Sequence, residues 1–153
     1  MRQAQKELTS LIRELRPVAL EGKGLTLALQ DQVANWQNQT GISVNLQVEG
    51  EQTLPLLVEE ALFRVTQEAL ANVARHSEAT SVQVLLSSER DAVMLSISDN
   101  GQGFATDATD GTGLGLLSMR ERMQTLGGNV EIQSTVGKGT TITAHCERVG
   151  VGV

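Results

Sequence analysis

Residues 42–49, ISVNLQVE, alternate strictly between apolar and polar side chains. Because successive side chains of a strand point to opposite faces, this run predicts a strand with one buried face and one wet face. The alternation returns in 80–87 and 92–99 around SERD, and in 129–136 and 140–147 around the turn VGKG. Each of these two pairs predicts an antiparallel hairpin.

Apolar residues at helical spacing predict the remaining elements. Helices are expected over residues 1–16, 25–39, 55–75 and 114–126. The longest of them has an apolar stripe made of Leu62, Val65, Ala69 and Val73. These helices are too few to cover both faces of a sheet, so the sequence predicts an α+β fold: a two-layer α/β sandwich whose mixed, mostly antiparallel sheet has helices on one face.

Composition excludes several classes of function. The 153 residues have a formal net charge of −6, so the chain lacks the basic field that holds nucleic acid or anionic lipid. The single cysteine, Cys146, excludes an internal disulfide and a cysteine-cluster zinc site, and fits a reducing, cytosolic compartment. We therefore expect no direct contact with nucleic acid.

Nine of the 15 glycines lie between Gly101 and Gly139, in the groups DNGQG, GTGLG, GG and GKG. Glycine lets backbone N–H groups approach an anion, and a loop that leads into a helix N-terminus is a natural phosphate site. Glycine is also the ordinary residue of turns, and a plain hairpin turn is the favoured interpretation of GKG. The Walker A pattern is absent, and no G-x-G-x-x-G follows a strand.

Asp99 ends the 92–99 strand on the same face as its apolar side chains. Burying a carboxylate there is costly unless a group donates hydrogen bonds to it, and the exocyclic amino group of adenine is such a donor. The alternative is that Asp99 only caps the Asn100-Gly101 turn.

The long helix has four polar residues that border its apolar stripe: Glu68, Asn72, Arg75 and His76. A carboxylate and an amide oxygen one turn apart suit Mg²⁺ that also holds phosphate oxygens. Arg75 offers a cation that complements phosphate. Taken by themselves, these residues are better explained as a solvated helix face, and the glycine loops are what favour a site.

Four segments together resemble a known family: QEALANVARHSEA, DNGQGF, GTGLGLLSMRERM and GKGTTI. They are similar, in this order, to the N, G1, G2 and final glycine boxes of the GHKL ATPases, whose Bergerat fold is a two-layer sandwich. More narrowly, they resemble the ATP-binding catalytic domain of two-component sensor histidine kinases. LIRELRPVALEGKGLTLAL and MRERM are similar to the subfamily of nitrate and membrane-fluidity sensors.

The resemblance implies a role for each matching residue. Asn72 would coordinate Mg²⁺, and Glu68 would polarise the attacking histidine or a metal-bound water, while Arg75 and His76 would lie near the phosphates. Asp99 would accept the adenine amino group. The other residues implied to bind ATP are Gly101, Gly103, Gly111, Thr112, Gly113, Leu114, Gly115 and Thr140, with a short lid over 104–112 hinged at the GTGLG glycines.

The resemblance also implies domain boundaries and partners. Residues 1–16 resemble the end of a dimerisation helix, and 17–153 the catalytic domain. Neither His76 nor His145 fits the pattern of a phosphoacceptor, so we expect a protein-histidine kinase domain that binds ATP and Mg²⁺ but does not label itself. This chain would be a cytoplasmic module of a longer homodimeric sensor kinase, whether or not a membrane anchors that protein. The longer protein would supply the acceptor histidine and pass the phosphoryl group to a response regulator with a helix-turn-helix output. This piece alone would be monomeric or weakly associated.

Two other functions share the glycine boxes. One is a GHKL serine kinase that restrains a sigma factor, which does not need the LIRELRP helix end. The other is an ATP-driven conformational clamp of the chaperone or DNA-repair type, which usually has longer lids and further domains.

Overall fold

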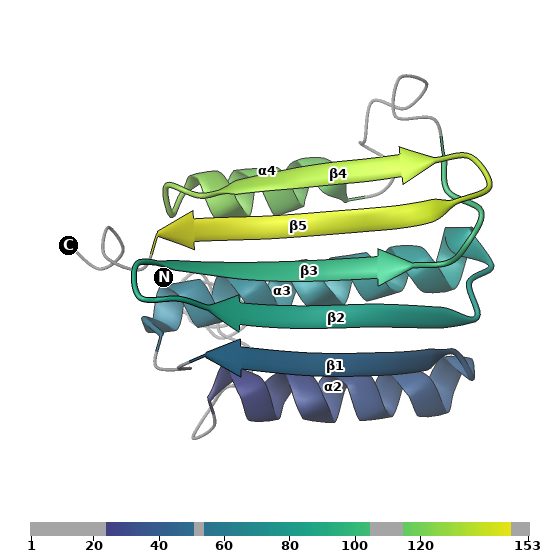
Figure 1. Cartoon of the computed structure of the whole chain (residues 1–153), viewed down its shortest axis with the longest axis horizontal. Helices are drawn as coiled ribbons and strands as arrows, with labels where there is room; N and C mark the ends of the chain where they lie inside the picture. Colours follow the sequence, from purple (N-terminus) through teal and green to yellow (C-terminus); the bar gives the residue numbers. More distant parts are fainter. Residues whose placement is uncertain (1–23, 51–53, 105–114, 148–153) are drawn as a thin grey trace, which may run out of the picture.

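A five-stranded sheet forms one layer of the molecule (Figure 1). The computed structural model describes residues 24–50, 54–104 and 115–147. In these ranges the strand order is β1-β2-β3-β5-β4. The strands are β1 (Ser43–Gly50), β2 (Ser81–Ser88), β3 (Ala92–Asp99), β4 (Asn129–Thr135) and β5 (Gly139–Glu147).

Helices form the second layer, and Figure 1 shows all of the labelled ones on one face of the sheet. They are α2 (Leu25–Thr40), α3 (Leu56–Asn72) and α4 (Leu116–Gln124). A π-helical turn, η2 (Val73–Ser77), continues α3. The predicted two-layer sandwich with helices on one face is therefore confirmed.

Both predicted hairpins are present as antiparallel pairs, β2 with β3 and β4 with β5. β3 also pairs antiparallel with β5, which joins the two hairpins into one sheet. β1 runs parallel to β2, and α3 lies between these two strands in the chain as a crossover. The sheet is thus mixed and mostly antiparallel, as the sequence predicts.

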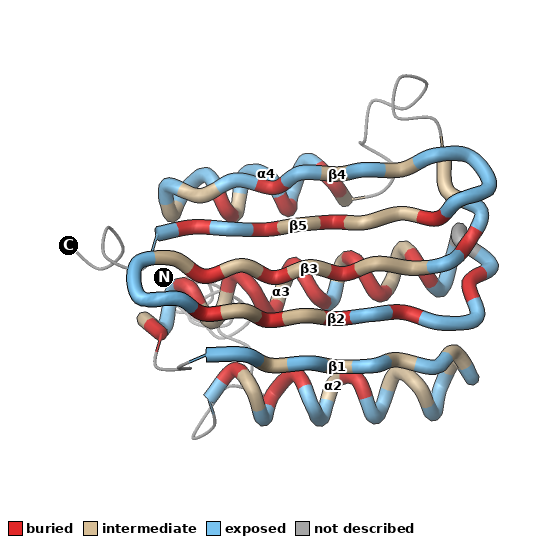
Figure 2. The backbone as a smooth tube through the Cα atoms, viewed as in Figure 1, coloured by how far each residue is buried: buried red, intermediate tan, exposed pale blue. Residues whose placement is uncertain are grey.

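The core lies between the two layers, where Figure 2 shows buried positions on the strands and on the helices. The predicted stripe of α3 is buried throughout, from Leu62 to Val73. The opposite face of the sheet is polar, because alternate residues such as Gln83 on β2 and Glu131 on β4 are exposed. The sheet-side core residues are Val82, Val84, Leu86, Val93, Leu95, Ile97, Val130, Ile142, Ala144 and Cys146.

The starts of two helices differ from the sequence prediction. Pro55 lies one position before the first residue of α3, where its fixed φ and missing N–H still cost nothing. α4 begins at Leu116 rather than Leu114, since Gly115 adopts a left-handed conformation, which an α-helix does not contain. The predicted helix at 1–16 falls outside the described residues.

The first backbone amide of α2 is bonded to a neighbouring helix. Leu25 N donates to Glu59 Oε2 of α3 at 2.9 Å. A carboxylate at a helix N-terminus accepts a hydrogen bond from an otherwise unpaired amide, and its negative charge interacts favourably with the positive end of the helix dipole. Within the described ranges, no helix has both the length and the apolar character needed to cross a membrane.

Candidate functional site

Asp99 is the last residue of β3, and its half-buried side chain lies at the end of the sheet. Its Oδ1 accepts a hydrogen bond from Gly101 N at 2.8 Å. Burial raises the pKa of Asp99 above its ordinary value, although hydrogen bonds from the backbone amides of Gly101 and Thr140 act in the opposite direction. Desolvation is thus the largest influence on this carboxyl group.

The hydrogen bond from Gly101 agrees with the turn-capping interpretation of Asp99. It uses only part of the hydrogen-bonding capacity of the side chain, however. An ionised carboxylate offers about four lone-pair sites, and two backbone amides use only part of that capacity. A desolvated acceptor with remaining capacity is well suited to an amino group of a ligand. Capping and ligand binding are therefore compatible at Asp99.

Asn100 joins the end of β3 to the start of β2. Its Oδ1 accepts from Thr80 N at 2.9 Å and from Ser81 N at 3.0 Å, and its Nδ2 donates to Thr80 Oγ1 at 2.9 Å. These three bonds leave the side chain of Asn100 little freedom. The backbone that follows Asp99 is consequently held in a defined position.

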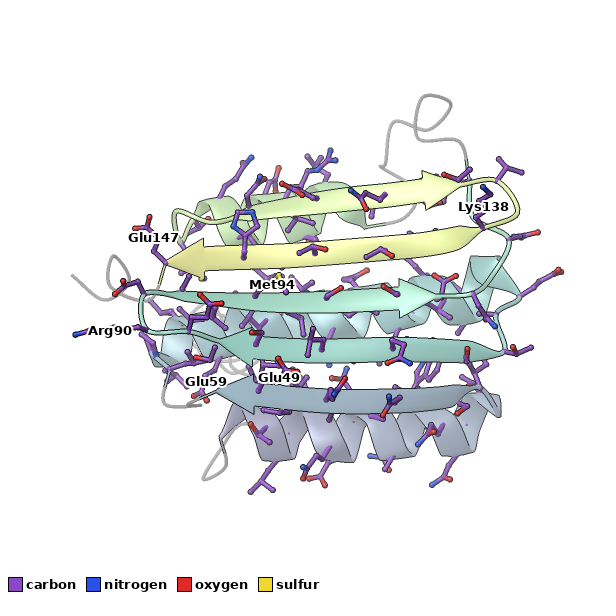
Figure 3. All side chains as sticks on the ribbon, in the orientation of Figure 1. Glu49, Glu59, Arg90, Met94, Lys138 and Glu147 are labelled. Atoms are coloured by element: carbon purple, nitrogen blue, oxygen red, sulfur yellow. The ribbon has the colours of Figure 1, made fainter. Side chains whose placement is uncertain are left out.

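The end of β4 and the turn between β4 and β5 contact the loop that follows Asp99. Gly137 N donates to Gln102 O at 2.6 Å, and Phe104 N donates to Ser134 Oγ at 2.8 Å. Lys138 marks this turn in Figure 3. GKG is therefore a hairpin turn, as the sequence predicts, but it also packs against the loop that begins at Asp99.

Gly139 shows how closely the two segments approach. Its φ is +86°, and a Cβ atom at this position would overlap the backbone carbonyl oxygen of Asp99. Gly103 is similarly placed, since a Cβ there would overlap the carbonyl oxygen of Thr135. Backbone atoms cannot move aside as a side chain can, so the packing requires glycine.

Glu68 and Asn72 are one turn apart on α3, and both are partly buried. The Oδ1 atom of Asn72 is shielded from solvent. The carboxylate of Glu68 lies against Gly115, where φ is +69°, and a Cβ on residue 115 would overlap Glu68 Oε2. The structure thus brings the polar face of α3 to the residue at which α4 starts.

Arg75 lies in η2, beyond the regular part of α3. Its side chain is exposed, and its Nε donates to Ala71 O at 3.3 Å. A π-helical turn has more residues per turn than an α-helix, so it rotates Arg75 relative to Glu68 and Asn72. The side chain of His76, in the same turn, lies outside the described residues.

The remaining predicted residues divide into three groups. Gly101 and Gly103 lie in the loop after β3, and Thr140 is the register partner of Asp99 on β5. His145 is exposed on β5. Four residues fall outside the described part of the chain: Gly111, Thr112, Gly113 and Leu114.

The described residues could bind Mg²⁺ only together with a ligand that supplies phosphate oxygens. In the described ranges, no group of three or more His, Cys, Asp and Glu side chains could hold a metal ion. Glu68 and Asn72 offer two oxygen ligands on one helix face. Mg²⁺ commonly binds one or two protein oxygens together with waters and phosphate oxygens, so this donor set suits it.

Two surface grooves lie away from these residues. One, of about 440 Å³, runs between α3 and α4 and contains Leu57, Glu60 and Leu126. The other, of about 340 Å³, runs between α2 and α3 and contains Gln32 and Trp36. Neither groove is lined by Asp99, Asn72 or Glu68.

Sequence reasoning missed two residues that shape the site, Asn100 and Ser134. Asn100 could have been found, because an Asn after an Asp and before a Gly often bonds nearby backbone. Ser134 gives no such signal, because a serine at a partly buried strand position is ordinary and its partners are distant in the chain.

Two curated relatives resemble most of this chain. Sensor histidine kinase LiaS of Bacillus subtilis (strain 168) is 40% identical over 140 residues, which are 92% of this chain and 39% of LiaS. Sensor protein VraS of Staphylococcus epidermidis is 37% identical over 139 residues, which are 91% of this chain and 40% of VraS. The chain thus spans about two fifths of the length of these relatives.

Two solved structures share the fold. The histidine kinase domain of the Erythrobacter litoralis EL346 blue-light activated histidine kinase superposes with a TM-score of 0.66 at 19% identity, covering 83% of this chain and 62% of that domain. Acinetobacter baumannii histidine kinase AdeS superposes with a TM-score of 0.65 at 17% identity, covering 81% of this chain and 63% of the AdeS chain.

A family model of ATPases matches residues 57–149, which include α3, both hairpins and α4. This segment also contains Glu68, Asn72, Asp99 and Thr140. Because the match covers more than half of the chain, the protein belongs to the family of histidine kinase-, DNA gyrase B- and HSP90-like ATPases.

Proposed function

We propose that this chain is the Mg-ATP-binding catalytic domain of a sensor histidine kinase. In this proposal it transfers the γ-phosphoryl group of ATP to a histidine on a dimerisation domain of the full-length protein. The similarity to LiaS and VraS supports the kinase class.

The observation that carries the proposal is the contact between Glu68 and Gly115. It joins the polar face of α3 to the glycine segment that leads into α4, although 47 positions separate the two residues. A carboxylate beside a glycine-rich helix start suits a reaction in which phosphate is held by backbone amides and a proton acceptor stands nearby.

Asp99 would recognise the base in this proposal. Its desolvated carboxylate would accept the adenine amino group, while the amides of Gly101 and Thr140 keep it in place. Thr140 would lie beside the base, since it is the register partner of Asp99. Gly101 and Gly103 would shape the pocket floor.

Asn72 and Glu68 would hold Mg²⁺ through their side-chain oxygens, and Arg75 and His76 would lie near the phosphates. When bound, Mg²⁺ would neutralise phosphate charge and orient the γ-phosphoryl group. Glu68 would also accept the proton of the attacking histidine nitrogen at its carboxylate. Residues 111–115 would contribute backbone amides to the phosphates.

The partners follow from the kinase class and are part of the proposal. A dimerisation domain would provide the acceptor histidine, with residues 1–16 as the end of its helix and 17–153 as the catalytic domain. A response regulator with a helix-turn-helix output would receive the phosphoryl group. The full-length protein would be a homodimer whose catalytic domain works in the cytoplasm, where ATP is available.

Incubation with γ-labelled ATP and Mg²⁺ tests the proposal. The chain alone should stay unlabelled, and a separately supplied dimerisation domain of the full-length protein should acquire an acid-labile label, as phosphohistidine does. The Asp99→Asn variant should transfer much less label than the wild type, which controls for contaminating kinases.

The alternatives give different results in the same assay. An acid-stable label on a protein substrate indicates a serine kinase. Slow ATP hydrolysis without any phosphoprotein indicates a conformational clamp. Either result, or strong labelling of this chain alone, contradicts the proposal.

A further inference from the structure

Ser134 is a partly buried residue near the end of β4, opposite Thr140 on β5. Its Oγ receives a hydrogen bond from Phe104 N at 2.8 Å. The same atom lies 2.7 Å from Thr140 Oγ1 and 3.3 Å from Gly139 O. One hydroxyl group thus contacts two segments: the end of the DNGQGF loop and the first two residues of β5.

These contacts match the hydrogen-bonding capacity of a hydroxyl group, which has one donor and two acceptor sites. Phe104 N–H can only donate, and Gly139 O can only accept. If Ser134 donates to Gly139 O, the second acceptor site of Ser134 takes the proton of the Thr140 hydroxyl. Ser134 then determines the direction in which the Thr140 hydroxyl points.

Thr140 links this arrangement to Asp99. The backbone amide of Thr140 donates to the Asp99 carboxylate, and the two residues are register partners across β3 and β5. Phe104 ends the described part of the loop that begins at Asp99. Ser134 therefore contacts the strand residue whose amide donates to Asp99 and the end of the loop that follows Asp99 in the chain.

We infer that Ser134 is a positioning residue for adenine recognition, acting through Thr140 and through the backbone of Phe104. This inference rests on the proposed function, because it presupposes that ATP binds at Asp99. Ser134 need not touch the nucleotide: it holds the groups that would. Loss of its hydroxyl should therefore weaken recognition of the base more than the chemistry at the phosphates.

The test compares Ser134→Ala with a matched control, Ser98→Ala. Ser98 Oγ lies 2.9 Å from Thr141 Oγ1, so it forms the same kind of cross-strand hydroxyl pair one residue away from Asp99 and Thr140. Ser98 and Thr141 occupy the alternate parity, on the other face of the sheet. Ser98→Ala should leave nucleotide binding within about twofold of the wild type, as expected for a substitution at an independent site.

Calorimetry with ATP and with inosine triphosphate, in which an oxo group replaces the adenine amino group, gives the decisive readout. Ser134→Ala should weaken ATP binding about tenfold, the loss expected for about one hydrogen bond, and should reduce the preference for ATP over inosine triphosphate. In phosphotransfer, KM for ATP should rise while kcat changes little. Ser134→Thr, which restores the hydroxyl, should recover most of the affinity.

A cycle with Thr140→Val tests whether the two hydroxyls act together. The double variant should bind ATP more tightly than the sum of the two single losses predicts, because Thr140→Val has already removed the hydroxyl contact that the two residues share. The inference is overturned if Ser134→Ala binds ATP like the wild type. It is also overturned if the variant loses both nucleotides equally with a lower melting temperature, which indicates a structural role only.

The same measurements distinguish a failure of the proposed function from a failure of this inference. A wild-type chain that binds neither nucleotide contradicts ATP recognition at Asp99 and removes the basis of the inference as well. A wild type that prefers ATP, together with a Ser134→Ala variant that keeps the same preference, overturns the role of Ser134 alone.

Discussion

The carboxylate of Glu68, in the last half of α3, lies against Gly115 at the start of α4. The Cδ atom of Glu68 is 3.2 Å from the position that a Cβ on residue 115 would occupy. This contact joins two segments on which the proposed phosphoryl transfer depends. It also provides a way to displace Glu68 without changing it.

Gly115→Ala should impair phosphotransfer far more than it impairs folding. The new methyl group meets the far end of a flexible side chain, so Glu68 can move aside and the added cost in stability is small. The positive φ of +69° by itself costs about 1–2 kcal/mol. Transfer to the dimerisation domain should fall about a hundredfold, as expected when a proton acceptor is misplaced.

Gly127→Ala is the matched control for this substitution. Gly127 has φ +75° with no atom within 4 Å of the added Cβ, so the variant has the backbone cost without a collision. Urea unfolding should give the two variants similar free energies of unfolding, and only Gly115→Ala should lose activity. Equal activities would show that the contact with Glu68 has no functional importance.

Asp99→Asn should abolish tight ATP binding yet leave the free protein at least as stable at neutral pH. Removing a charged acceptor weakens a ligand hydrogen bond about tenfold to a hundredfold. The amide oxygen can still accept from the backbone amides of Gly101 and Thr140, and the desolvation of a charge is removed. Calorimetry and urea unfolding of the same preparation measure both effects.

The pKa of Asp99 determines whether its contribution to stability rises or falls with pH. Burial raises the pKa of Asp99 in the folded protein above the ordinary 3.8, so the folded state binds the proton more tightly than the unfolded state. The contribution of Asp99 is therefore fully present below pH 3.8 and is lost as pH rises through the folded-state pKa. The stability of Asp99→Asn relative to wild type should increase from acidic to neutral pH, and a decrease would contradict the assigned environment.

Gly139→Ala should destabilise the fold much more than Gly137→Ala in the same turn. Both glycines have positive φ, +86° and +82°, so the backbone cost is similar. At residue 139 the methyl group would overlap the carbonyl oxygen of Asp99, whereas at residue 137 nothing lies within 4 Å. The difference in the free energy of unfolding should be about 1–3 kcal/mol, the usual cost of overpacking. Thermal unfolding of the two variants measures it, and equal melting temperatures would contradict the close approach.

Side-chain periodicity was sufficient to predict the local elements. Alternation in 42–49 and in the two hairpins identified each strand and its apolar face, because a pleated strand turns alternate residues to opposite faces whatever its partners are. On β1 that apolar face is only partly buried. The stripe from Leu62 to Val73 identified the buried side of α3 for the same kind of reason. The place of Asp99 on the inner face of β3 also followed from parity.

Contacts between distant segments could not be predicted in this way. The parallel pairing of β1 with β2, the joining of the hairpins through β3 and β5, and the hydroxyl contacts of Ser134 all depend on which elements pack together. The π-helical turn that contains Arg75 has no sequence signal of its own.

The glycines show the division most clearly. Their number indicated turns, because glycine tolerates positive φ wherever it stands, and their order in the chain resembles the glycine boxes of a family of ATPases. The sequence could not tell Gly115 from Gly127, or Gly139 from Gly137. Only packing distinguishes them, since Glu68 and the backbone of Asp99 reach two of these positions and leave the other two open.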